Sequence, residues 1–199
     1  MILFIEGPRH CGKTYLINRF FEQNTDPRFV YYKFYFVNWV RRLGLNNDDT
    51  NASLHYMSLG NILSVMEKMN GDKSKIVVFD RGLFSCYVWS QLRKRIPITV
   101  ALAEIEAIMR SPEYNNCRTL FIEPALQEER ADDRNKDMWD NLHSSKEEYE
   151  MFRLFFDETV RFNTLLDHNT SVMEMFNSFT ENDVLTFQGT LYDCLSDLN

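Results

Sequence analysis

The chain has 199 residues, of which 44% are hydrophobic and 14% aromatic, so we expect one packed domain over residues 1–199 and not a disordered chain. Its formal net charge of -7 argues against a large nucleic-acid surface, although a small basic groove remains compatible with it. No stretch approaches the about 20 apolar residues of a membrane span. The four cysteines form neither a disulfide framework nor a zinc motif, so we expect a soluble protein of a reducing cytoplasm with no membrane partner.

Strands and helices are expected to alternate along the chain. Short apolar runs predict strands at residues 1–6, 29–37, 75–79, 119–122 and 171–176. Apolar residues at helical spacing predict helices at residues 13–23, 54–69, 85–93 and 100–109, one after the capping-box pattern of Ser145 and Glu148, and a last one from residue 181. This alternation predicts an α/β fold, a three-layer sandwich around a mainly parallel five-stranded sheet.

The stretch GPRHCGKT, residues 7–14, stands between the first strand and the first helix and matches G-x-x-x-x-G-K-[ST], the phosphate-binding loop. Its glycines permit a tight wrap of backbone amides around a phosphate, and the helix dipole adds to the attraction. Lys13 is expected to contact the β- and γ-phosphates and Thr14 the metal, so ATP and Mg²⁺ are the expected cofactors. The expected nucleotide contacts are Gly7, Pro8, Arg9, His10, Cys11, Gly12, Lys13, Thr14 and Tyr15.

A second motif, VVFDRG at residues 77–82, places an acidic residue at the end of a buried strand, where ligands bind in parallel sheets. Asp80 is expected either to hold Mg²⁺ through water or to accept the proton of an attacking hydroxyl. Arg81 is expected to hold an anionic acceptor. Tyr35 and Trp39 follow the second strand, where an acceptor base could stack on them, although both residues suit the core equally well.

Two arginines, Arg130 and Arg134, follow the fourth strand at a spacing that puts them on one side of a helix. They could close over the γ-phosphate as part of a lid at about residues 127–146. A solvated charged face is the competing interpretation, because acidic residues surround both arginines.

FIEGPRHCGKT (residues 4–14) followed by VVFDRGLFSCYVW (residues 77–89) resembles the thymidylate kinase and deoxynucleoside kinase group of P-loop kinases, and a viral (phage) member of that group is an open alternative for this chain. The spacing of Asp80, Arg81 and Ser85 is similar to the D-R-x-x-x-S pattern of thymidylate kinases, and PALQEERADDR (residues 124–134) resembles the start of their lid. The resemblance implies the fold of nucleoside-monophosphate kinases. It also implies that Lys13 and Arg130 or Arg134 stabilise the moving phosphoryl group, that Arg81 and Ser85 contact the acceptor, and that a homodimer is an open alternative.

The acceptor remains open at this stage. The stretch KFYFVNW, residues 33–39, lacks the carboxylate that deoxynucleoside kinases carry after their second strand. The leading expectation is transfer of the γ-phosphate of ATP to a nucleoside or nucleotide. Some viral P-loop kinases of this size instead phosphorylate the hydroxymethyl group of a modified base such as 5-hydroxymethyluracil in DNA, which makes DNA an alternative partner. A third alternative is a nucleotide-dependent switch with slow hydrolysis.

Overall fold

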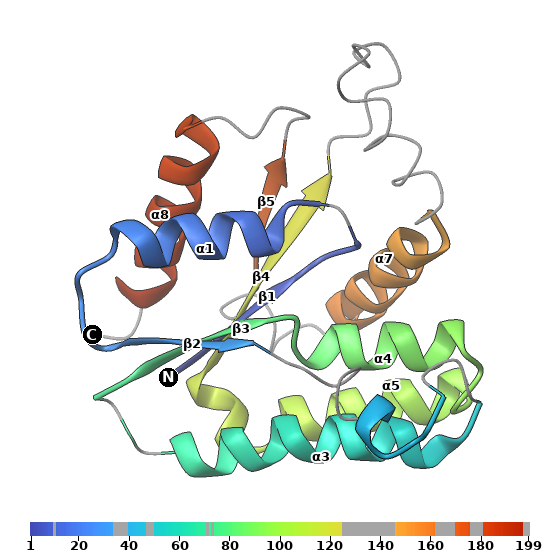
Figure 1. Ribbon diagram of the computed structural model, residues 1–199. Helices are drawn as coiled ribbons and strands as arrows, with labels where there is room; N and C mark the ends of the chain where they lie inside the picture. Colours follow the sequence, from blue (N-terminus) through green and yellow to red (C-terminus); the bar gives the residue numbers. More distant parts are fainter. Residues whose placement is uncertain are drawn as a thin grey trace, which may run out of the picture.

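The structure, a computed structural model, describes residues 1–9, 11–33, 40–46, 50–70, 72, 74–124, 146–161, 170–175 and 181–196 (Figure 1). Its strands are β1 (Ile2–Glu6), β2 (Phe29–Lys33), β3 (Ile76–Asp80), β4 (Cys117–Pro124) and β5 (Thr170–Met175). Its helices are α1 (Lys13–Gln23), α3 (Ala52–Met69), α4 (Leu83–Leu92), α5 (Ile98–Met109), the 3₁₀ helix η1 (Pro112–Asn116), α7 (Lys146–Arg161) and α8 (Glu181–Ser196).

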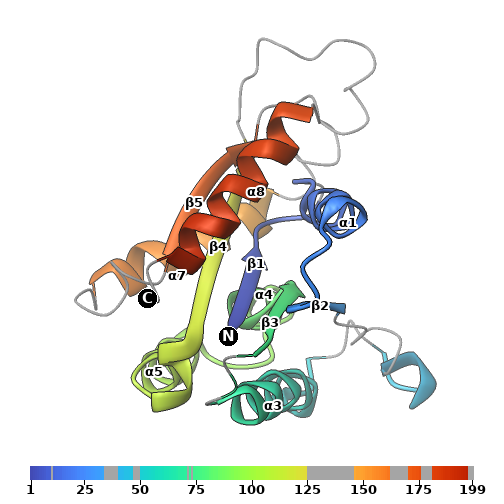
Figure 2. The same ribbon diagram turned by 90° about the vertical axis from the view of Figure 1, so that its left-hand side faces the viewer.

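The strands form one sheet in the order β2-β3-β1-β4-β5, and every neighbouring pair is parallel. The strand directions rotate progressively across the sheet, which gives it the usual twist (Figure 2). All residues of the central strands β1 and β3 are buried, as expected for strands covered on both faces. The expected α/β fold with a parallel sheet is therefore confirmed.

Side chains alternate between two cores, one on each face of the sheet. Leu3 and Ile5 point to the face covered by α1 and α8, whose core includes Leu16, Phe20 and Phe187. Ile2, Phe4, Val77 and Phe79 point to the other face, which α3, α4, α5 and α7 cover (Figure 1). On that side, the rings of Phe4 and Phe79 pack edge to face, with the ring centres 5.3 Å apart. The chain is thus a three-layer structure in which β1 lies at the centre.

Several boundaries differ from the sequence-based expectation: α3 and α5 each begin two residues earlier than expected, and β4 ends two residues later. β4 begins at Cys117, two residues earlier than expected, because Arg118 interrupts the apolar pattern yet folds back onto the carbonyls of Asn115 and Cys117 and stays buried. The helix η1 before it was not predicted. α4 begins at Leu83 and not at residue 85, because a carboxylate from another strand caps its first turn. Within the described part of the chain, no helix is both long and apolar enough to cross a bilayer.

Candidate active site

The glycines of the phosphate-binding loop adopt conformations that require glycine. Gly7 has a φ of 140°, and a Cβ there would lie 2.5 Å from the backbone oxygen of Ile122 on β4. Gly12 has a φ of 87° and ends the loop as the N-cap of α1. Both values lie in the region that L side chains avoid. The chain therefore wraps tightly between β1 and the positive end of the α1 dipole, as an anion site requires.

Lys13 is folded onto this loop. Its ammonium group donates a hydrogen bond to the carbonyl oxygen of Pro8 at 2.5 Å and lies 3.2 Å from the sulfur of Cys11. The side chain is only 4% exposed. Burial lowers the pKa of Lys13, and the nearby positive charge of Arg81 lowers it further. A bound phosphate would offer this ammonium group a negatively charged partner that the loop carbonyl cannot match.

Asp80, the last residue of β3, lies next to the first turn of α1. Its Oδ2 accepts a hydrogen bond from the hydroxyl of Thr14 at 2.6 Å and another from the hydroxyl of Tyr31 on β2 at 3.2 Å. Its Oδ1 is buried and has no hydrogen-bond partner among the described residues. A buried carboxylate oxygen without a partner is costly unless a ligand satisfies it. This pair of a hydroxyl and a carboxylate suits Mg²⁺, which prefers oxygen ligands and retains water.

Arg81 follows directly and has a φ of 73°, an uncommon conformation for a residue with a side chain. Such backbone strain is found mainly where a side chain must be aimed at a ligand. Gly82 permits the bend, because a Cβ at this position would lie 2.2 Å from the Phe4 ring. The packing of Phe4 on β1 therefore requires glycine directly after Arg81.

Glu6, at the end of β1, fixes the beginning of α4. Its carboxylate accepts hydrogen bonds from the backbone amides of Gly82 (3.1 Å), Phe84 (2.9 Å) and Ser85 (3.2 Å), and also from the Ser85 hydroxyl. The side chain is fully buried, and this burial raises the pKa of Glu6, while the four hydrogen bonds oppose the shift. Glu6 thus acts as a helix cap supplied by the neighbouring strand.

Ser85 was expected to contact the acceptor. The structure places it 3% exposed, with its hydroxyl bound to Glu6. This geometry favours a structural role for Ser85, which ties the first turn of α4 to Glu6 at the end of β1.

A further carboxylate, that of Glu148, joins the two motifs. It accepts hydrogen bonds from the backbone amide of Arg9 at 3.1 Å and from the Arg9 Nε at 2.7 Å, and it pairs with Arg81 at 3.4 Å. The Arg9 guanidinium also lies 4.7 Å from the centre of the Trp89 ring on α4. The sequence pattern assigned Glu148 to a capping box with Ser145, which lies outside the described residues, so its part in the site was missed.

Behind the site, a buried polar cluster joins α3, α4 and α5. The ring of His55 is fully buried, with Nδ1 2.8 Å from the Ser90 hydroxyl and Nε2 3.1 Å from Glu104. Glu104 also accepts hydrogen bonds from the hydroxyls of Tyr56 and Tyr87. The cluster therefore ties α3, which precedes the Asp-Arg motif in the chain, to α4 and α5, which follow it.

Several expected site residues lie outside the described part of the chain, namely His10, Tyr35, Trp39, Arg130 and Arg134. Their roles, and the lid at about residues 127–146, stay predictions. Of the remaining loop residues, Cys11 is buried, whereas Tyr15 is 40% exposed on α1. The structure brings Lys13, Thr14, Asp80 and Arg81 together at one end of the sheet, and their roles also stay predictions.

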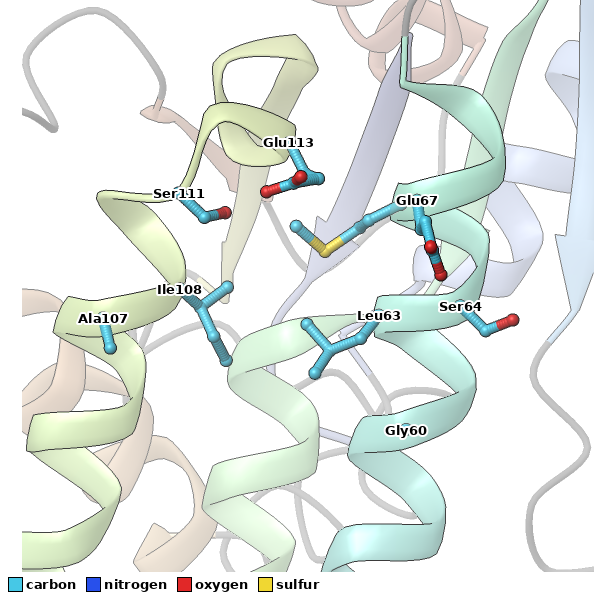
Figure 3. A pocket seen from close by; sticks show the side chains of 9 residues that line it. Gly60, Leu63, Ser64, Glu67, Ala107, Ile108, Ser111 and Glu113 are labelled. Atoms are coloured by element: carbon cyan, nitrogen blue, oxygen red, sulfur yellow. The ribbon is translucent and has the colours of Figure 1, made fainter.

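A cavity of about 550 Å³ lies between α3, α5 and η1 (Figure 3). Leu63, Met66 and Ile108 supply its apolar lining, and Glu67 and Glu113 stand at its border. The C-terminal half of α3 leads into the start of β3, and η1 leads into the start of β4. The cavity therefore lies at the end of the sheet where the strands begin, whereas the phosphate-binding loop lies at the end where they finish. We do not assign the cavity to the same site.

Comparison with known proteins identifies the fold through structure alone. No family model matches the chain, and no curated protein sequence matches it significantly. Thymidylate kinase from Ehrlichia chaffeensis superposes with a TM-score of 0.57 over 96% of this chain and 98% of that one, at 16% identity. Thymidylate kinase from Candida albicans gives a TM-score of 0.58 over 98% of this chain and 92% of that one, at 13% identity.

The protein NadR in complex with NAD and AMP-PNP superposes with a TM-score of 0.59 over 96% of this chain, at 14% identity. The chain spans only 48% of the length of that NadR structure. The chain therefore has the same fold as these two thymidylate kinases and NadR. The similarity to thymidylate kinases that the motifs suggested thus extends to the architecture of nearly the whole chain.

Proposed function

We propose that the protein is a kinase that transfers the γ-phosphate of ATP, with Mg²⁺, to a nucleoside or nucleotide acceptor, either to a hydroxyl group of a nucleoside or to a phosphate oxygen of a monophosphate. The observation that carries the proposal is the convergence of two motifs, in which Thr14 of the phosphate-binding loop is bonded to Asp80 and Arg81 lies beside it. The thymidylate kinase fold supports a nucleotide kinase. The strained arginine beside the loop favours phosphoryl transfer over a simple nucleotide switch.

The metal would be held by the Thr14 hydroxyl and, through water, by Asp80, whose buried Oδ1 lacks a protein partner among the described residues. When bound, Mg²⁺ would neutralise negative charge on the phosphates of ATP. Lys13 would turn from the Pro8 carbonyl to the phosphates, and Arg81 would orient the acceptor. Arg130 and Arg134 of the lid are proposed to add positive charge to the transferred group.

In the transfer, the acceptor oxygen forms a bond to the γ-phosphorus while the bond to the β–γ bridging oxygen breaks, and ADP leaves with that electron pair. Where the acceptor is a hydroxyl group, its proton leaves late, because such transition states are loose, and it ends in solvent. Where the acceptor is a phosphate oxygen, the attacking atom is already anionic and no proton has to leave. The protein's own contribution is to position the two substrates and to stabilise charge.

The test is ADP production from Mg·ATP with a panel of acceptors. The panel contains thymidine and other deoxynucleosides, their monophosphates, plain duplex DNA and DNA that carries 5-hydroxymethyluracil. Lys13→Ala should reduce turnover by about 10²–10³-fold. Lys68→Ala, which removes an exposed lysine on α3, is the matched control and should leave turnover unchanged.

Each outcome assigns a function. Stimulation by a small nucleoside or monophosphate supports the proposal and identifies the acceptor. Phosphate incorporated only into modified DNA assigns the acceptor to a base in DNA. Stoichiometric ATP binding without any acceptor-dependent ADP contradicts the kinase proposal and favours a nucleotide switch.

A further inference from the structure

Glu148 lies at the start of α7 but contacts both motifs of the candidate active site. It is 1% exposed, and both of its carboxylate oxygens are used. Oε1 accepts from the Arg9 backbone amide and pairs with Arg81, while Oε2 accepts from the Arg9 Nε at 2.7 Å. The residue is separated from Arg9 by 139 positions in the chain, so no local pattern reveals the contact.

A buried carboxylate is stable only when donors surround it. Here the donors are an amide of the phosphate-binding loop and the guanidinium groups of two arginines. Arginine side chains lose much conformational freedom when they are fixed, at a cost of up to about 2 kcal/mol each. Glu148 fixes Arg9 and Arg81 before any substrate binds. The two side chains therefore lose this conformational entropy during folding and not when the substrate binds.

Glu148 itself is held rigidly by the packing of α7 on α4. The Phe156 ring of α7 stacks on the Phe84 ring of α4 with the ring centres 4.6 Å apart, and the centres of the Phe155 and Tyr87 rings are 6.2 Å apart. Phe84 and Tyr87 belong to the helix that follows Arg81 directly. The carboxylate therefore stands at a fixed distance from both the loop and the end of β3.

We propose that Glu148 is a positioning residue for phosphoryl transfer, which holds the guanidinium groups of Arg9 in the phosphate-binding loop and of Arg81 beside it in fixed orientations, so that Arg81 is ready to receive the acceptor. This inference rests on the proposed kinase function. Glu148 contacts the arginines and not the reacting atoms, so it acts through them. Misplacement of such groups by about 1 Å costs about 10²-fold in rate.

The kinetic test compares Glu148→Gln with Glu147→Gln, which alters an exposed glutamate in the same helical turn. In Glu148→Gln we expect kcat/KM for the acceptor to fall by about 10–100-fold, because the amide group of Gln repels one of the donors. The affinity for ATP measured without acceptor should change much less, since Lys13 and Thr14 are untouched. Glu148→Asp, which keeps the charge, should recover part of the loss, whereas Glu147→Gln should behave as wild type.

A second measurement needs no catalysis. The Arg9 Nε–H should give a nitrogen-bound proton signal that exchanges slowly with solvent in the nucleotide-free protein, because it donates to a buried carboxylate. Loss of the signal in Arg9→Lys would assign it to the Nε–H group of Arg9. We expect the signal to persist in Glu147→Gln and to vanish in Glu148→Gln.

The outcomes separate the two proposals. A signal unchanged in Glu148→Gln contradicts the positioning role, whichever reaction the protein catalyses. A lost signal with unaltered kinetics also contradicts it. If the wild type transfers phosphate to no acceptor, the kinase function fails and the positioning role in transfer fails with it. If Glu148→Gln does not fold, Arg9→Gln tests the same bond from a side chain that is 45% exposed, and normal transfer by that variant overturns the inference.

Discussion

The Thr14 hydroxyl donates to Asp80 Oδ2 at 2.6 Å, which joins the first turn of α1 to the last residue of β3. Both groups would contribute to the metal site, so Asp80→Asn should weaken the response to Mg²⁺ more than the binding of ATP itself. We expect turnover at saturating Mg²⁺ to fall by about 10²–10³-fold. Calorimetric titration of ATP with and without Mg²⁺ would show that the metal no longer improves affinity.

Asp26→Asn is the control for this substitution, because the Asp26 carboxylate lies at the surface before β2 and bonds to the side chain and the backbone amide of Arg28, away from the phosphate-binding loop. Removal of Mg²⁺ by a chelator should stop turnover in the wild type and in this control. An Asp80→Asn enzyme with an unchanged Mg²⁺ dependence would show that the carboxylate has no part in holding the metal.

Gly82→Ala should destabilise the fold, because the new methyl group would lie 2.2 Å from the Phe4 ring. We expect the free energy of unfolding in urea to fall by about 1–3 kcal/mol. Gly60→Ala is a control with the opposite sign, because a Cβ there meets nothing within 4 Å and Gly60 lies inside α3. In that variant the free energy of unfolding should rise by about 0.4–1 kcal/mol.

The double variant Phe4→Leu with Gly82→Ala tests the cause. If the clash with the ring is responsible, the two substitutions together should cost less than the sum of the single effects. Strict additivity would mean that Gly82 is needed for another reason.

The parts of the site that are local in sequence could be predicted from it. The glycines, Lys13 and Thr14 of the loop carry a fixed spacing, and Asp80 ends an apolar run of strand length. These features depend on backbone conformation over a few residues, which residue type and spacing encode. The alternation of elements likewise predicted the parallel sheet.

The contacts that support the site could not be predicted in this way. Glu6 lies 76 positions from Gly82, and Glu148 lies 67 positions from Arg81, so each contact exists only after the sheet and α7 have assembled. One signal was present in Glu6, a carboxylate that ends an otherwise apolar strand. A buried charge at such a position calls for several donors, but the sequence does not show which groups supply them.

Glu6→Gln should therefore destabilise the protein although it preserves the shape of the side chain. One of the two carboxylate oxygens becomes an amide group, which faces backbone amides or the Ser85 hydroxyl and cannot accept from them. We expect a loss of about 1–3 kcal/mol in the free energy of unfolding. Glu67→Gln, at an exposed position of α3, should change stability by less than about 0.5 kcal/mol. Equal effects of the two substitutions would contradict the capping role.

His55 gives the protein a pH-dependent stability. Burial lowers the pKa of His55 below its ordinary value of about 6.5, and this effect exceeds the opposing hydrogen bond and charge of Glu104. The groups that face the ring or influence its charge are Tyr56 on α3, Cys86, Tyr87 and Ser90 on α4, Glu104 on α5, and the nearby Arg95. The histidine is therefore held neutral in the folded state at neutral pH.

The direction of this pH dependence of stability follows from the number of protons that the folded and unfolded states bind. Between the lowered pKa of the folded state and about 6.5, the unfolded chain binds more protons than the folded one, so acidification favours unfolding. The contribution of His55 is fully present above about pH 6.5 and is lost as the pH falls toward the folded-state pKa. The loss is about 1.4 kcal/mol for each pH unit that separates the folded-state pKa from the unfolded-state pKa.

Urea unfolding of the wild type and of His55→Gln between pH 5 and pH 8 would measure this contribution. Other titrating groups are common to both proteins and cancel in the difference of their stabilities. We expect the advantage of the wild type over His55→Gln to be constant above about pH 6.5 and to shrink below it. An advantage that grows on acidification would show that Glu104 stabilises the protonated ring more than burial disfavours it, and that the cluster behind α4 is an ion pair.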